Sequence, residues 1–198
     1  MNKKSNALFF LGYDARKALS DKQLEELKEN NIYTCSTPWG RQSAGVIECF
    51  LENNSIGSSI AIGFCGGVNE NLEVGDVLIA KEAVYCNSLA YSNKELANNV
   101  LSSLRACNAY LARTETIDSI EIENRHFLER LKAKRVDAIE METFRLFAKS
   151  NKLKKPTASV LIVSDIPDGN IKDSIRIPKE AYEKVPKLAD ICADLLDD

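Results

Sequence analysis

The sequence predicts an α/β fold, a three-layer α/β/α sandwich around a central mixed sheet. Short apolar runs alternate with helical patterns along all 198 residues, and helices that cover both faces of a sheet produce this alternation. The runs are apolar throughout rather than at every second position, as in strands buried on both faces. No repeat, low-complexity tract or linker interrupts the pattern, so we expect a single domain over residues 1–198.

The expected strands are apolar runs that glycine or polar residues bring to an end. Ala7–Leu11 stops at Gly12, and Thr157–Val163, the clearest buried strand, stops at Ser164. Ser59–Ile62 runs into a loop that is rich in glycine. In chain order, the expected strands are residues 7–11, 59–62, 77–80, 110–112 and 157–163.

The expected helices show apolar residues at a spacing of three and four. The one that starts at Ser20 also has capping residues before Leu24 and Leu27. Pro156 follows the helix expected at 137–152, and proline is common just after a helix end. In chain order, the expected helices begin at residue 20 and then cover 42–53, 94–106, 123–134, 137–152 and 178–196.

Three segments follow directly after expected strands: Gly12–Arg16, Gly63–Gly67 and Ser164–Asp165. Ligands of open α/β sheets collect at the carboxyl ends of strands, so we expect a binding site there. In the first segment, the arginine either grips an anion with its fork of donors or lies on the surface. The loop Pro38–Arg41 offers a second arginine, beside a tryptophan that acts as a lid or a loop anchor.

The expected helix over 137–152 carries two acids around one methionine. Glu142 shares the apolar stripe of Ile139 and Leu146, whereas Glu140 lies about 200° away around the axis at roughly 100° per residue. On this geometry, the two carboxylates cannot serve one site through one helix face. A buried carboxylate needs hydrogen-bond donors. Glu142 therefore has either a structural role, in an ion pair or a contact with N–H groups at a helix end, or a role in binding a ligand.

Other candidates lie at the remaining two strand ends. Asp165 follows Ser164 at the end of an expected strand. This acid either contacts a ligand or caps a turn. Gly66 and Gly67 let backbone approach a ligand closely, although G-x-x-G-G is neither a dinucleotide fingerprint nor a P-loop. Cys65 has no cationic neighbour in sequence, which favours a small buried filler over a nucleophile.

Composition excludes several kinds of site. A net charge of −3 argues against nucleic-acid backbones and anionic membranes as partners. The six cysteines are scattered without zinc spacing, so no metal is expected, and His126 stands on a charged helix face as a surface residue. The first apolar run is too short for the apolar region of a signal peptide or for a membrane span. Together with the expectation that the thiols are free, this predicts a cytoplasmic setting.

These segments resemble the nucleoside phosphorylase/nucleosidase superfamily. The resemblance is carried by Gly63–Gly67 with Gly75–Asp76 after it, by Asp137–Thr143, and by Val163–Asp165. Together these motifs cover about residues 59–80 and 136–168, in the order and spacing of the family. The resemblance implies a phosphorylase/hydrolase-like fold and cleavage of the N-glycosidic bond of a purine nucleoside or related ribosyl compound.

The resemblance also implies roles for individual residues. Glu142 would bind the sugar hydroxyls, Met141 would pack under the sugar, and Asp165 would protonate the leaving purine. Ser164 and the glycines Gly66 and Gly67 would lie against the ligand.

Five positions bear on the nucleophile. Phosphorolytic relatives carry an arginine and a serine where this chain has Ala61 and Phe64, so part of a phosphate site is missing. Gly12 and Arg16 resemble the phosphate motif of those relatives without its proline, and Arg16 stands where hydrolytic relatives place a glutamate. We therefore expect phosphorolysis, with Arg41 compensating for Ala61. Hydrolysis of a nucleoside or nucleotide, and nucleoside binding without catalysis, are the alternatives.

Two further expectations follow from the resemblance. The segment between Ala80 and Val136 is short for the family, and Thr116–Asp118 is a remnant of its base-recognition part. No cofactor is expected beyond inorganic phosphate as a co-substrate, and the expected partners are a small nucleoside and further copies of the chain.

Overall fold

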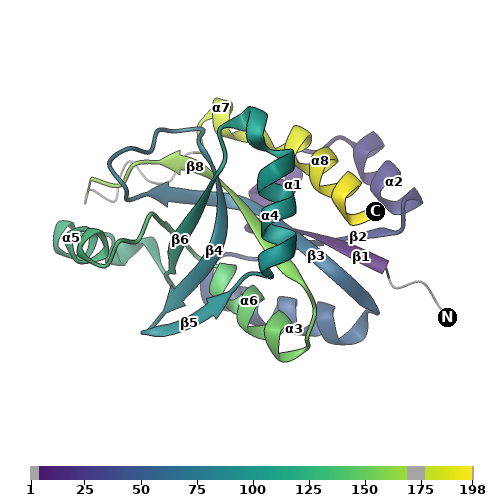
Figure 1. Cartoon of the computed structure of the whole chain (residues 1–198), viewed down its shortest axis with the longest axis horizontal. Coiled ribbons are helices and arrows are strands. Elements are labelled where there is room, and N and C mark those ends of the chain that lie inside the picture. The colour runs from purple at the N-terminus through teal and green to yellow at the C-terminus, as the bar shows by residue number, and fades with distance from the viewer. Residues whose placement is uncertain (1–4, 169–176, 198) are drawn as a thin grey trace.

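The computed structural model of the chain describes residues 5–168 and 177–197. In this part of the chain, eight strands form one sheet, and helices cover both of its faces (Figure 1). The strands are β1 (Ser5–Phe10), β2 (Ile32–Ser36), β3 (Ile56–Gly67), β4 (Val77–Tyr85), β5 (Ser88–Tyr91), β6 (Tyr110–Thr116), β7 (Ala138–Glu140) and β8 (Thr157–Asp165). The mixed sheet and the two helical layers confirm the predicted fold class.

The helices are α1 (Tyr13–Lys17), α2 (Asp21–Glu29), α3 (Ser43–Asn53), α4 (Lys94–Ser103), α5 (Arg125–Ala133), α6 (Thr143–Lys152), α7 (Lys179–Tyr182) and α8 (Val185–Asp197). Three short 3₁₀ helices, η1 (Gly40–Gln42), η2 (Arg105–Cys107) and η3 (Ile120–Ile122), lie in the connections. The Ser20 hydroxyl accepts from the Gln23 N–H while the Gln23 side chain accepts from the Ser20 N–H, which confirms the predicted start of α2.

The sheet is mixed, and part of it closes on itself. Strand β3 is parallel to β1 and β8 but antiparallel to β7, while β4 is parallel to β6 and antiparallel to β8. Since β6 also pairs with β7, the strands β3, β8, β4, β6 and β7 form a closed circuit. The closed circuit brings the end of β3, the end of β8 and the short strand β7 close together.

Successive residues of β1 point into two different cores. Leu8 and Phe10 pack with α1, α2, α4 and α8, whereas Ala7 and Phe9 pack with α3 and α6 on the opposite face. Strand side chains alternate between faces, so a strand covered on both sides reads as a continuous apolar run. Figure 1 shows α4 and α8 on one side of the sheet and α3 and α6 on the other.

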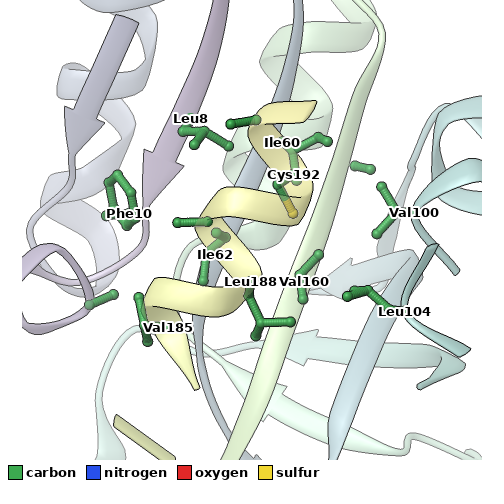
Figure 2. Packing of buried hydrophobic residues seen from close by; sticks show 14 of the residues in the cluster. Leu8, Phe10, Ile60, Ile62, Val100, Leu104, Val160, Val185, Leu188 and Cys192 are labelled. Atoms are coloured by element: carbon green, nitrogen blue, oxygen red, sulfur yellow. The ribbon is translucent and has the colours of Figure 1, made fainter. Parts of the chain in front are cut away.

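Helix α8 fills the centre of the first core. Figure 2 shows Val185, Leu188 and Cys192 of this helix facing Ile62 of β3 and Val160 of β8. All five side chains are at most 1 % exposed. The thiol of Cys192 therefore acts as a small apolar filler, and burial raises its pKa to about 12.

Three sequence expectations differ from the structure. The glycine segment after Ser59–Ile62 is not a loop, because β3 continues in ladder pairing to Gly67. The helix expected over 178–196 is divided into α7 and α8. Strands β2 and β5 were not expected, since Ile32–Ser36 is partly polar and Ser88–Tyr91 has only four residues. Among the described residues, no helix is both long and apolar enough to cross a membrane.

Candidate active site

A cavity of about 320 Å³ opens at the ends of the strands in the closed circuit. Leu11 after β1, Gly66 at the end of β3 and Asp165 at the end of β8 line it. Residues 117–120 after β6 and the segment 139–142 also belong to its lining. Two of the three predicted strand ends therefore meet at one cavity, and the third reaches it through Leu11 alone.

The segment Ala138–Thr143 does not begin a helix, which corrects the sequence prediction. Residues 138–140 form β7, Ile139 pairs with Gly66 on one side and Glu115 on the other, and the helix α6 starts only at Thr143. The angular argument that separated the two acids therefore does not apply. Glu140 and Glu142 are 3 % and 4 % exposed, and both line the cavity.

The carboxylate of Glu140 holds the start of α6. Its Oε2 accepts hydrogen bonds from the backbone N–H groups of Glu142 at 2.7 Å and Thr143 at 2.5 Å, and its Oε1 accepts from the Thr116 hydroxyl. Free N–H groups at a helix N-terminus favour a negative charge. Glu140 therefore supports the start of α6, which begins later than predicted.

Glu142 has fewer donors and a different environment. Its Oε1 accepts from the Gly40 N–H at 2.7 Å, in the loop that also carries Trp39. Burial, and then the neighbouring charge of Glu140, raise the pKa of Glu142 to about 8, while the Gly40 N–H and Arg145 act in the opposite direction. A buried carboxyl that is easily protonated and faces a cavity is a candidate for binding hydroxyl groups. Met141 lines the cavity beside it.

Asp165 is the second carboxyl that opens on the cavity. Its Oδ1 lies 2.8 Å from the Ser164 hydroxyl, which also lies 3.2 Å from the carbonyl oxygen of Cys65. Burial raises the pKa of Asp165, and the Ser164 hydrogen bond lowers it in part. A carboxyl with a raised pKa in a cavity is suited to carrying a proton to a bound molecule.

Sequence reasoning missed Glu123, a third acid on the cavity. It lies at the end of η3, is 5 % exposed, and its Oε2 has no hydrogen-bond partner. Burial and the nearby Asp165 raise the pKa of Glu123 to about 7. In the sequence, it is one of several charged residues between two expected elements, and no pattern distinguishes it from its exposed neighbours.

Asp118 lies at the edge of the cavity in a cluster of cations. Arg41 donates to its Oδ2 at 2.7 Å, Arg145 forms an ion pair with its Oδ1, and the Tyr85 hydroxyl donates to Oδ2 at 2.9 Å. The hydrogen bond from Arg41 is the main cause that lowers the pKa of Asp118. Arg145, which the sequence did not single out, is held further by the Met141 carbonyl at 2.5 Å.

The residues expected to bind phosphate lie outside the cavity lining. The side chain of Arg41 is 78 % exposed and engaged with Asp118, and Arg16 is exposed on α1. Gly12 adopts φ +73°, and a Cβ there would stand 2.3 Å from Nε1 of Trp39. Gly12 therefore allows the tryptophan ring to pack against the backbone beside the cavity. Trp39 itself is 55 % exposed to solvent.

Of the two glycines at the end of β3, one faces the cavity. Gly66 lines the cavity, and a Cβ at this position would lie 2.8 Å from the Pro167 side chain. Gly67 is not part of the cavity lining, and a Cβ there would lie 2.7 Å from the Ile166 side chain. Phe64 lines the wall and stacks on Tyr182 with ring centroids 6.4 Å apart. Cys65 is fully enclosed, and burial raises the pKa of its thiol well above the usual range, in agreement with a filler role.

The other candidates carry no site in the described part of the chain. His126 is exposed on α5, as the surface interpretation predicts. Within residues 5–168 and 177–197, no group of three or more histidine, cysteine, aspartate or glutamate side chains is placed to hold a metal ion.

Comparison with known proteins agrees with this arrangement. The family model described as the phosphorylase superfamily matches residues 23–115. A purine nucleoside phosphorylase of the DeoD type from Brevibacillus brevis is 30 % identical over 129 residues. In sequence, the chain is therefore similar to the phosphorylase superfamily. Another DeoD-type purine nucleoside phosphorylase, from Buchnera aphidicola, is 28 % identical over 153 residues.

These two purine nucleoside phosphorylases are longer than the part that matches this chain. The alignments cover 58 % and 70 % of this chain, and 54 % and 64 % of the respective relatives. The chain therefore spans between half and two thirds of the curated relatives it matches.

Solved structures of a nucleosidase and of a uridine phosphorylase share the fold over nearly the whole chain. A 5′-methylthioadenosine/S-adenosylhomocysteine nucleosidase from Campylobacter jejuni superposes with a TM-score of 0.83 at 15 % identity, covering 98 % of this chain and 99 % of that one. A uridine phosphorylase from Vibrio fischeri gives 0.77 at 17 % identity, covering 98 % and 92 %. At such low identity, these matches establish the fold.

Proposed function

We propose that this chain cleaves the N-glycosidic bond of a purine nucleoside or a related ribosyl compound. One observation carries the proposal: Glu142, Met141 and Asp165, which the sequence motifs single out, line the same cavity. The match to the family model of the phosphorylase superfamily and the activities of the similar proteins support it.

The arrangement of the acids suits this chemistry. As the glycosidic bond breaks, its electron pair leaves with the base and the sugar gains positive charge. Asp165 donates a proton to the leaving base, which its raised pKa favours. Glu142 binds the sugar hydroxyls, and the growing positive charge stabilises its ionised form. Met141 packs against the sugar.

Water is the nucleophile that the cavity lining favours. Glu123, Glu140, Glu142 and Asp165 surround the space, and none of its described lining residues is lysine or arginine. A phosphate dianion needs cationic or N–H donors to replace its hydration, whereas water needs none. The Phe64 ring also occupies wall space where phosphorolytic relatives have a serine.

Phosphorolysis is the second candidate, since both matched curated relatives are purine nucleoside phosphorylases. In that case Gly12, Arg16 and Arg41 would bind phosphate, as the sequence predicts. Arg41 would have to leave Asp118, and Arg16 would have to turn toward the cavity. These phosphate contacts stay a prediction.

Three broader features belong to the same proposal. We expect one domain over the whole chain, a homo-oligomer, and a cytoplasmic location with no cofactor; inorganic phosphate is a co-substrate only in the phosphorolytic alternative. The family resemblance supports the oligomer, and the free thiols support a reducing compartment.

Base release from a nucleoside panel, with and without inorganic phosphate, tests the proposal. Release of free base without phosphate supports hydrolysis, and release that requires phosphate supports phosphorolysis. If no nucleoside is cleaved although nucleosides raise the melting temperature, the cavity binds without catalysis and the proposed activity is wrong.

A further inference from the structure

The carboxyl of Glu123 stands out among the acids of the cavity because one of its oxygens has no partner. Glu140 accepts from two backbone N–H groups and a hydroxyl, and Glu142 accepts from Gly40. Asp165 is bonded to Ser164. Oε2 of Glu123 is buried with no donor within hydrogen-bond distance, although the residue lines the cavity.

A buried acceptor without a donor is unfavourable, and folded proteins rarely keep one. Here the backbone fixes the residue: the N–H of Glu123 donates to the Ile120 carbonyl at 3.0 Å, and the next residue, Asn124, caps α5 through the Phe127 N–H. The segment therefore holds the carboxyl in the wall of the cavity rather than letting it turn to solvent. A bound molecule with an N–H group would complete its hydrogen bonding.

Glu123 lies close enough to Asp165, the proton-carrying acid, for the two carboxyls to interact. Burial, and then the neighbouring Asp165, raise the pKa of Glu123, because two neighbouring carboxyls disfavour a second negative charge. A base that donates an N–H to Glu123 would supply the donor that its buried oxygen lacks.

We propose that Glu123 is a specificity-determining residue that accepts a hydrogen bond from an N–H group of the base, such as an exocyclic amino group. This rests on the proposed function for the placement of the base near Asp165. The site then prefers bases with an N–H donor away from the glycosidic nitrogen over bases that lack one. A site built around such a donor rejects the analogue that lacks it, because the acceptor is left unpaired.

The experiment compares adenine with unsubstituted purine, which lacks the amino group, by calorimetric binding to the whole chain. The wild type should bind adenine at least ten-fold more tightly than purine. In Glu123→Leu the ratio should fall to about one- to two-fold, whereas Glu123→Gln, which keeps an acceptor oxygen, should retain most of it. Glu121→Leu, an exposed acid two residues earlier, is the matched control and should behave as the wild type.

A kinetic comparison of adenosine with purine riboside should give the same pattern in kcat/KM. An adenine-to-purine binding ratio that Glu123→Leu leaves unchanged would overturn the proposal, as would a wild type that binds neither base. If the wild type shows the predicted binding ratio but releases no base from either nucleoside, the cleavage activity fails while the role of Glu123 stands. Should Glu123→Leu not fold, the pair Glu123→Gln and Glu123→Ala decides by the same ratio.

Discussion

At the residue scale, the acids of the cavity differ in how their charge is satisfied. Glu140 and Asp118 are surrounded by donors or cations, so they serve as anchors for backbone and side chains. Burial raises the pKa of the remaining three, Glu123, Glu142 and Asp165. The groups with raised pKa values are therefore the ones left to interact with a ligand.

The pKa of Glu142 has a consequence for stability. The folded-state pKa is about 8, above its ordinary value of 4.5, so between these values the folded chain binds more protons than the unfolded chain. The free energy of unfolding should therefore fall as pH rises through this window. Glu142→Gln removes the titration, so the variant should gain on the order of 3 kcal/mol relative to the wild type between pH 5 and pH 8.

Urea denaturation of both proteins across this pH range measures the effect. Glu123 and Asp165 titrate in both proteins, so their contributions cancel in the difference. Glu140 and Arg145 also face this carboxyl and are retained in the variant. A difference in stability that does not change with pH would mean that Glu142 is ionised in the folded chain throughout.

The sequence could predict part of this residue-scale chemistry and not the rest. Glu142, Met141 and Asp165 stand in recognisable motifs, so their shared site was predictable. Glu123 and Arg145 reach the site only through the path of the chain after β6 and at the start of α6. No local pattern marks them among 55 charged residues, counted as 26 basic and 29 acidic.

At the scale of elements, Ala138–Glu140 forms a strand although its local residue spacing fits a helix. The residues fit a helix face, but β7 fills the space between β3 and β6 and completes the closed circuit. Tertiary pairing can override local propensity in a segment this short. The extension of β3 through its glycines has the same cause, because Gly66 and Gly67 pair with β7. Longer elements such as α3 and α4 followed their sequence patterns closely.

Gly12 tests the role of the connection between β1 and α1, and Gly45 in α3 serves as the comparison. Gly12→Ala forces a side chain into a positive φ and against Trp39, so the free energy of unfolding should fall by about 1–2 kcal/mol. Gly45→Ala, within α3 and with no atom within 4 Å of the added Cβ, should raise it by about 0.5–1 kcal/mol. Denaturation in urea compares the two; a Gly12→Ala variant as stable as Gly45→Ala would contradict the packing of Trp39 described above.

At the scale of the whole molecule, the cavity is assembled from segments that span residues 11–177. The alternation of strands and helices predicts that strand ends gather at one edge, and this was enough to locate Gly66, Ser164 and Asp165. The closure of five strands into a circuit depends on pairings between β4 and β8 and between β6 and β7, far apart in sequence. Such long-range pairings leave no periodic signal, so the shape of the cavity and the exclusion of Arg16 and Arg41 from its lining were beyond the sequence.

The most direct test of the central claim is free-base release by the wild type and by Asp165→Asn on the same purine nucleoside. Asparagine keeps the size of the side chain but cannot donate a carboxyl proton, so kcat should fall by about 10²- to 10⁴-fold. Asp21→Asn, which makes the same change at an exposed position on α2, should leave it unaltered. Equal turnover by Asp165→Asn and the wild type would contradict the assignment of this cavity as the site of bond cleavage.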